Sequence, residues 1–171
     1  MSRIAYSSAD VAIDTMRRHY VPIVSTIFAC LIALLPIVMS SPIIPDFALL
    51  VLIAWRLLRL EIWAPTTALP LGLFNDLVAG HPIGQSMALW TTLFLIYEIM
   101  DARLVFRDYW MDWFVAALSI IFCMFGAWYI GYLMGNRIDF MVMLPQLGLS
   151  VLAYPIVSRL VLGLDRWRLT R

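Results

Sequence analysis

The chain has 171 residues, of which 63% are hydrophobic and 13% are charged, and its mean hydropathy is +0.90. Soluble domains carry about a quarter of their residues as charges, so this composition excludes a water-soluble surface and favours a chain solvated by lipid. A membrane crossing takes about 20 residues, so the length allows five or six helices and no separate catalytic domain. The net charge of +1 gives no electrostatic reason to expect nucleic-acid binding.

The first apolar run follows a short polar N-terminal segment. Residues 7–20 predict either an amphipathic helix on the cytoplasmic leaflet or a loosely ordered tail. Residues 21–39 form an apolar stretch too long for the core of a secretory signal, and no small-x-small cleavage site follows it. The sequence therefore predicts an uncleaved first membrane helix.

Five more apolar segments follow, separated by prolines, glycines and charged turns. The second begins at Asp46, which is placed to cap it, and it is short enough that Arg56 and Arg59 are expected to extend to the membrane interface. The pattern predicts an all-α integral membrane protein with one domain over residues 1–171. Its six transmembrane helices form a single bundle and span about 21–39, 46–58, 63–78, 83–100, 113–134 and 140–162.

The arginines predict the orientation of this bundle. All twelve basic residues are arginine, and with six crossings eleven of them fall on the side that holds both termini. Only Arg137 falls on the opposite side. Because positive residues accumulate on the cytoplasmic side, we expect both the N- and the C-terminus in the cytoplasm.

The most informative motif is Gly72-x3-Asp76-x3-Gly80-x-Pro82-x-Gly84, in the third apolar segment and the turn after it. Gly72, Asp76 and Gly80 are four residues apart, so they share one face of the predicted helix. Glycines on such a face let another backbone approach closely. We interpret the five residues as a packing or partner-binding motif.

Two roles remain open for Asp76. Its position about one turn from the outer end of the helix would let the carboxylate cap backbone N–H groups at the start of the next helix, near Gly84 and Ser86. An ionisable residue in a membrane helix is also a functional candidate by default, so Asp76 is alternatively a recognition residue for a partner or ligand.

With this motif, its size and its six predicted crossings, the chain resembles the MreD family of bacterial rod shape-determining proteins over essentially its whole length. The resemblance implies a non-enzymatic, multipass scaffold in the bacterial inner membrane that regulates lateral peptidoglycan synthesis and rod shape. It also implies binding to the bitopic protein MreC and, through it, an indirect association with MreB filaments and a peptidoglycan synthase.

Two pairs of small residues suit helix packing. Gly131 and Gly135 form a GxxxG in the fifth apolar segment, and Ala29 and Ala33 are spaced in the same way in the first. Such pairs are frequent in membrane helices, so we expect contacts within the bundle rather than oligomerisation.

Four further residues have plain interpretations. Cys30 and Cys123 lie in apolar runs without a CxxC spacing and are expected to be buried free thiols. Glu98 and Arg159 lie near the same predicted end of the bundle, where they either pair or extend independently to the interface.

Enzymatic motifs are missing from the sequence. It contains no G-x-S-x-G, no H-E-x-x-H and no P-loop. His19 and His81 fall on opposite sides of the predicted membrane, and a lone histidine is a poor metal site. We expect no catalysis, no cofactor and no metal.

A second class also fits the length, namely the substrate-binding membrane subunit of an energy-coupling-factor transporter. These subunits have about six helices, and the Ala29–Ala33 spacing resembles their small-residue coupling face. The predicted outer loops are very short and supply few polar groups for a ligand pocket, which favours the scaffold.

Overall fold

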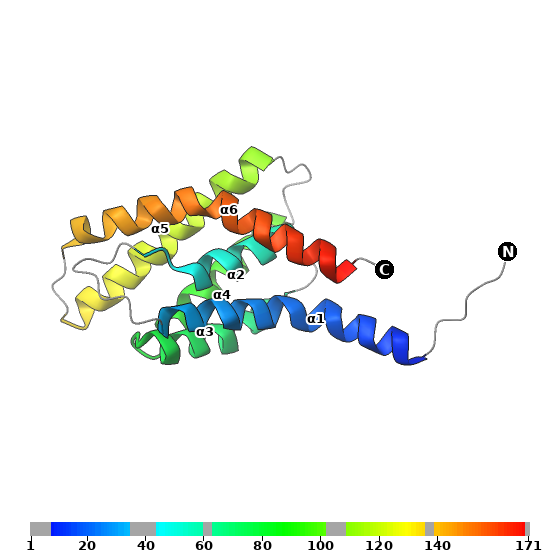
Figure 1. The fold of residues 1–171 in the computed structure, drawn as a ribbon. Coiled ribbons are helices and arrows are strands. Elements are labelled where there is room, and N and C mark those ends of the chain that lie inside the picture. The colour runs from blue at the N-terminus through cyan, green and yellow to red at the C-terminus, as the bar shows by residue number, and fades with distance from the viewer. Residues whose placement is uncertain (1–7, 35–43, 60–62, 102–108, 136–138, 170–171) are drawn as a thin grey trace.

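A computed structural model describes residues 8–34, 44–59, 63–101, 109–135 and 139–169 (Figure 1). The chain is all-helical over these residues. Its elements are α1 (Ser8–Leu31), η1 (Ile32–Leu34), α2 (Phe47–Leu58), α3 (Pro65–Ala79), α4 (Gln85–Asp101), α5 (Tyr109–Leu133), η2 (Phe140–Met143) and α6 (Leu144–Leu169).

The first helix differs from its predicted bounds. α1 begins at Ser8, so the polar segment before the apolar run is continuous with it and is neither a separate surface helix nor a loose tail over residues 8–20. Pro22 does not break the helix, and the hydroxyls of Ser25 and Thr26 both donate to the Pro22 carbonyl at 2.9 Å. Hydropathy indicates which residues can lie in lipid, but a helix can extend through the polar residues beside them. The end of an apolar run is therefore not always the end of the helix. The last predicted residues, 35–39, lie outside the described ranges.

The other helices lie close to their predicted positions. α2, α3, α4 and α5 begin and end within four residues of the predictions, and the Asp46 cap is confirmed because its Oδ1 accepts from the Leu49 N–H at 3.1 Å. The last helix extends beyond its predicted end at residue 162. Its polar final turns continue as helix because Asp165 and Arg168 pack inside the molecule, being 2% and 4% exposed.

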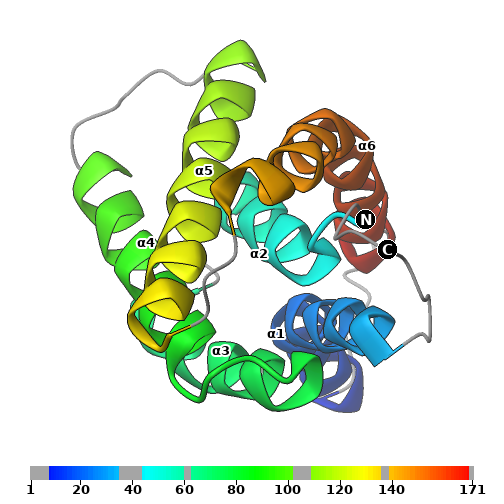
Figure 2. The ribbon, with the colours of Figure 1, turned by 90° about the vertical axis from the view of Figure 1, so that its left-hand side faces the viewer.

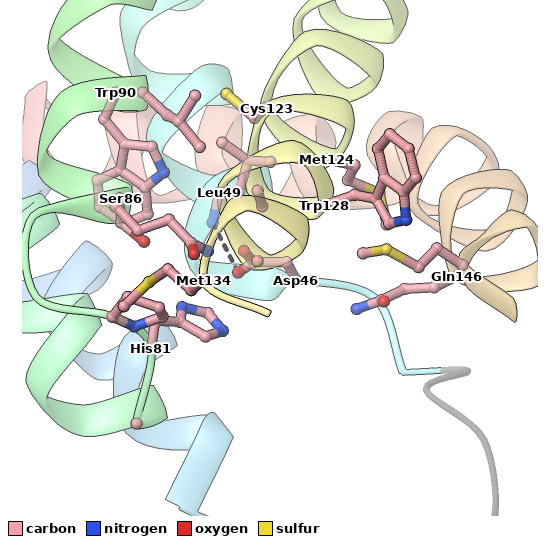
Figure 3. A pocket seen from close by; sticks show the side chains of 17 residues that line it. Asp46, Leu49, His81, Ser86, Trp90, Cys123, Met124, Trp128, Met134 and Gln146 are labelled. Carbon is pink, nitrogen blue, oxygen red and sulfur yellow. Dashed lines mark hydrogen bonds between the residues drawn. The ribbon is translucent and has the colours of Figure 1, made fainter. Parts of the chain in front are cut away.

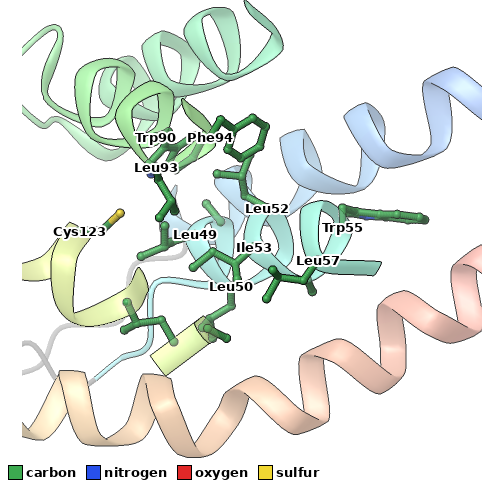
Figure 4. Packing of buried hydrophobic residues seen from close by; sticks show 14 of the residues in the cluster. Leu49, Leu50, Leu52, Ile53, Trp55, Leu57, Trp90, Leu93, Phe94 and Cys123 are labelled. Carbon is green, nitrogen blue, oxygen red and sulfur yellow. The ribbon is translucent and has the colours of Figure 1, made fainter. Parts of the chain in front are cut away.

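α2 is the central helix of the molecule. It contacts α1, α5 and α6, and Figure 2 shows these helices arranged around it. A short helix that is apolar on every side suits such a position. Its side chains pack with Trp90 and Phe94 of α4 and with Cys123 of α5 (Figure 4).

The central position of α2 overturns the interpretation of Arg56. We expected Arg56 to extend to the interface, but its side chain is 4% exposed. Its guanidinium lies 5.8 Å from the ring centroid of Phe94 and 5.7 Å from that of Tyr97. Because α2 is enclosed up to its last turn, Arg56 is held by cation–π contacts inside the bundle.

Large apolar side chains also cover the outside, where Phe28 and Leu152 are both 68% exposed. An apolar exterior of this kind suits contact with lipid. By length and composition, two described helical stretches could cross a membrane, Tyr109–Leu133 and Phe140–Leu169. The apolar helix α2 has 12 residues and spans about 18 Å, less than the roughly 30 Å of a bilayer core. Six crossings remain a prediction.

The helices define two ends of the molecule. α1 begins and α6 ends at one of them, as Figure 1 shows, and there Arg59 at the end of α2 pairs with Asp165 of α6. We call this the Arg59 end. At the opposite end, the Ile44 carbonyl before α2 accepts from the Gln146 side chain of α6 at 2.9 Å. We call this the Asp46 end.

Candidate functional site

The Gly72–Gly84 motif forms a tight corner between α3 and α4. Asp76, which is 1% exposed, uses both carboxylate oxygens to accept backbone N–H groups from the start of α4. Oδ1 accepts from Ser86 at 2.8 Å, while Oδ2 accepts from Gly84 at 2.9 Å and from Met87 at 3.5 Å. Of the two roles left open by the sequence, these contacts are those of a helix cap.

The three glycines of the motif have different structural roles. A Cβ on Gly72 would lie 2.6 Å from the Met87 Cα, so this glycine allows α3 and α4 to touch, as predicted. Gly80 and Gly84 have nothing within 4 Å of such an atom, and their φ angles are +70° and +95°. Gly80 therefore does not belong to the packing face, because it ends α3 in the left-handed conformation that glycine adopts freely. Pro82 contributes its carbonyl, which accepts from the Gln85 N–H at 3.0 Å.

The geometry of the corner predicts graded effects at Asp76. Asparagine offers one acceptor oxygen where the carboxylate uses two, so Asp76→Asn turns an amide N–H₂ toward a backbone N–H. We expect a loss of about 1–2 kcal/mol in the free energy of unfolding for Asn and roughly 2–3 kcal/mol for Ala, because buried donors lose a charged acceptor. Thermal unfolding in detergent measures both, with Asp139→Asn as a control because Asp139 caps η2 with a single exposed bond. Equal stability of Asp76→Asn and wild type would contradict the two-oxygen cap.

The small-residue pairs do not make the contacts expected of them. A Cβ on Gly131 or Gly135 would meet nothing within 4 Å, and Gly135 lies beyond the end of α5 with a φ of +88°. The prediction of bundle packing at this pair is therefore wrong within the described chain. Ala29 is buried in α1, but Ala33 falls in the 3-10 turn η1, so the two do not form one α-helical face.

The remaining residues singled out in the sequence are the two cysteines and the pair Glu98 and Arg159. Cys30 and Cys123 are free and buried, as predicted. Glu98 and Arg159 are both exposed and form no ion pair with each other. Among the described residues, no three histidine, cysteine, aspartate or glutamate side chains lie close enough to hold a metal ion.

The structure contains a cavity of about 410 Å³ at the Asp46 end that the sequence did not predict (Figure 3). Its walls come from the start of α2, the α3–α4 turn, the end of α5 and the start of α6. The deep part is apolar and aromatic and includes Trp90 and Met124, whereas Asp46, His81 and Gln146 supply polar groups. We expected too few polar groups here for a ligand pocket, because the predicted loops are short. The polar groups come instead from the ends of the helices.

Asp46 and His81 give this cavity its chemistry. Only Oδ1 of Asp46 forms a hydrogen bond that caps α2, and within the described ranges this carboxylate has no ion-pair partner. The Nδ1 of His81 is buried and lacks a hydrogen-bond partner there. The His81 backbone N–H donates to the Asp76 carbonyl at 3.0 Å, so the capped corner fixes this residue beside the cavity.

A second, apolar groove of about 940 Å³ runs between α1 and α6 on the outside of the bundle. Its walls include Val24, Phe28, Ile156 and Leu160. The hydroxyl of Ser25, which also lines the groove, accepts from the Trp55 indole at 2.8 Å and is therefore already hydrogen-bonded. The groove and the cavity at the Asp46 end share no lining residue.

Comparison with protein-family models, curated proteins and solved structures found no match to this chain.

Proposed function

We propose that this chain is a non-enzymatic scaffold of the bacterial inner membrane, of the MreD type, that holds the transmembrane helix of a single-pass partner resembling MreC. The observation that carries the proposal is the apolar groove between α1 and α6. Through its partner the scaffold would regulate lateral peptidoglycan synthesis and rod shape, as the sequence resemblance implies.

The groove has the length and chemistry for a helix. Its lining residues extend from Tyr20 on α1 to Ile32 in η1, and from Ala153 to Trp167 on α6. Fifteen helical residues rise about 22 Å, a large part of the bilayer core. In lipid, helices associate through close packing rather than hydrophobic transfer, so a concave apolar surface gains contacts when another helix fills it.

Filling the groove tests this proposal. Leu160 and Leu152 are both on α6 and are 65% and 68% exposed, but only Leu160 lines the groove. We expect Leu160→Trp to reduce retention of a copurifying single-pass protein by at least about tenfold, equivalent to 1.4 kcal/mol. Leu152→Trp should retain the partner like wild type. Equal retention by both variants would reject the groove as the partner site, and bound phospholipid in its place would assign it to lipid.

The topology is part of the same proposal. Six crossings with both termini in the cytoplasm agree with eleven of the twelve arginines lying on one side, and α1 begins at the same end of the molecule at which α6 finishes (Figure 1). A reporter fused after Arg171 should read cytoplasmic, and one inserted at His81 should read periplasmic. A periplasmic signal from the Arg171 fusion would exclude six crossings.

One observation favours a second function, the substrate-binding subunit of an energy-coupling-factor transporter. The cavity at the Asp46 end has the size of a small-molecule site. Copurification with ATP-hydrolysing subunits would support the transporter, whereas copurification with a single-pass coiled-coil protein would support the scaffold.

A further inference from the structure

We propose that the cavity at the Asp46 end binds an organic ammonium ion that carries a small apolar body. The inference does not depend on the scaffold function, because the cavity and the α1–α6 groove have no lining residue in common. The site is formed by the ends of helices that meet only in the folded chain.

The negative charge of the cavity lining favours a cationic ligand. Among the described residues that line the cavity, Asp46 is the only carboxylate and none is an arginine. Oδ1 of Asp46 accepts from the Leu49 N–H, and a carboxylate has further lone pairs that can accept hydrogen bonds from a ligand. A carboxylate beside a partly apolar cavity is stabilised by a cation that donates hydrogen bonds to it. An anionic ligand would face this charge with no arginine among the described lining residues to compensate it.

His81 supplies a second acceptor. Its buried Nδ1 has no hydrogen-bond partner among the described residues, and in the tautomer that carries hydrogen on Nε2 this atom accepts a hydrogen bond. Figure 3 shows the Asp46 carboxylate between His81 and Gln146. A primary ammonium group has three N–H donors, so it can donate to Asp46 and, once a rotation of the imidazole exposes Nδ1, also to His81.

The remaining wall suits an apolar body. Trp90 and Trp128 present aromatic rings, and Met124, Met134 and Met143 present flexible thioethers that adapt to different shapes. The volume of about 410 Å³ lies within the range of small-molecule pockets, which is far more than a bare metal ion needs. The amine could belong to a lipid headgroup or to a soluble molecule, and both share this chemistry.

Binding of phenethylammonium to the full chain in nanodiscs tests the proposal, with 2-phenylethanol as the neutral probe of similar shape. We expect phenethylammonium to bind at least about tenfold more tightly than 2-phenylethanol, because a hydrogen bond between an ammonium and a carboxylate is stronger than one from a neutral hydroxyl. Asp46→Asn keeps an oxygen for the Leu49 N–H, so it should unfold at the wild-type temperature while losing that preference. Asp139→Asn changes an acid that does not line the cavity and should bind like wild type.

A second variant reduces the volume of the cavity and leaves the Asp46 cap of α2 unchanged. Gly131 lines the cavity with open space beside it, so Gly131→Leu should fill the cavity and abolish binding of both probes, whereas Gly163→Leu should not. Nanodiscs with phosphatidylethanolamine should weaken phenethylammonium binding if the natural ligand is a lipid amine, and unchanged binding would indicate a soluble amine. Equal affinity for the two probes, or undiminished ammonium binding by Asp46→Asn or Gly131→Leu, would overturn the proposal.

Discussion

Replacing Asp165 by alanine is expected to lower the free energy of unfolding by about 3–5 kcal/mol, the cost of leaving a buried charge without its partner. Asp165 is 2% exposed, and its Oδ1 accepts from Arg168 at 2.6 Å while its Oδ2 accepts from Arg59 at 2.8 Å. Arg168 is itself buried and lies 5.5 Å from the ring centroid of Trp55. The variant therefore removes the carboxylate that compensates a guanidinium inside the bundle.

Two companion variants separate this effect from a loss of surface charge. Arg59 is 44% exposed, so Arg59→Ala should cost about 1 kcal/mol or less. The double change Asp165→Leu with Arg168→Leu removes both buried charges and should recover most of the stability that Asp165→Ala loses. Thermal unfolding in detergent provides the measurement. A similar loss for Arg59→Ala and Asp165→Ala would show that burial of the pair is not what stabilises this end.

Replacing Gly72 by leucine is expected to prevent the chain from folding stably. An ideal Cβ at this position would lie 2.6 Å from both the Cα and the N of Met87 and 2.8 Å from the carbonyl carbon of Ser86. These are backbone atoms of α4, so no side-chain rotation relieves the contact. Overpacking a core costs about 1–3 kcal/mol for small insertions, and we expect Gly72→Ala to reach that range and Leu to exceed it.

Gly163 provides a control at which the same substitution by alanine should stabilise the protein. It lies within α6, and a Cβ there would meet nothing within 4 Å. Gly163→Ala should raise the free energy of unfolding by up to about 1 kcal/mol, because alanine favours helix over glycine. Yields of folded protein after membrane extraction and midpoints of thermal unfolding distinguish the two sites. A Gly72→Ala variant as stable as Gly163→Ala would show that α3 and α4 do not pack as closely as described.

The sequence alone determined where most helices lie. Apolar runs between prolines, glycines and charges located α2 to α5 within four residues, and Asp46 was correctly identified as a cap. These features are local, because a helix end depends on its own capping residue and on the turn that follows. The close approach at Gly72 was also predictable, since the spacing of small residues along one helix face is visible in a linear sequence.

Only the tertiary structure decided which distant residues meet and how deeply each is buried. Arg59 and Asp165 are 106 positions apart, and Ile44 and Gln146 are 102 apart, so no periodicity connects them. Arg56 was expected at an interface because a short helix suggested it, yet α2 lies at the centre and encloses it. The cavity at the Asp46 end arises in the same way, because its charge comes from α2, its imidazole from the α3–α4 turn and its aromatic wall from α4 and α5. Burial depends on what all the other helices cover, a property that no single segment carries.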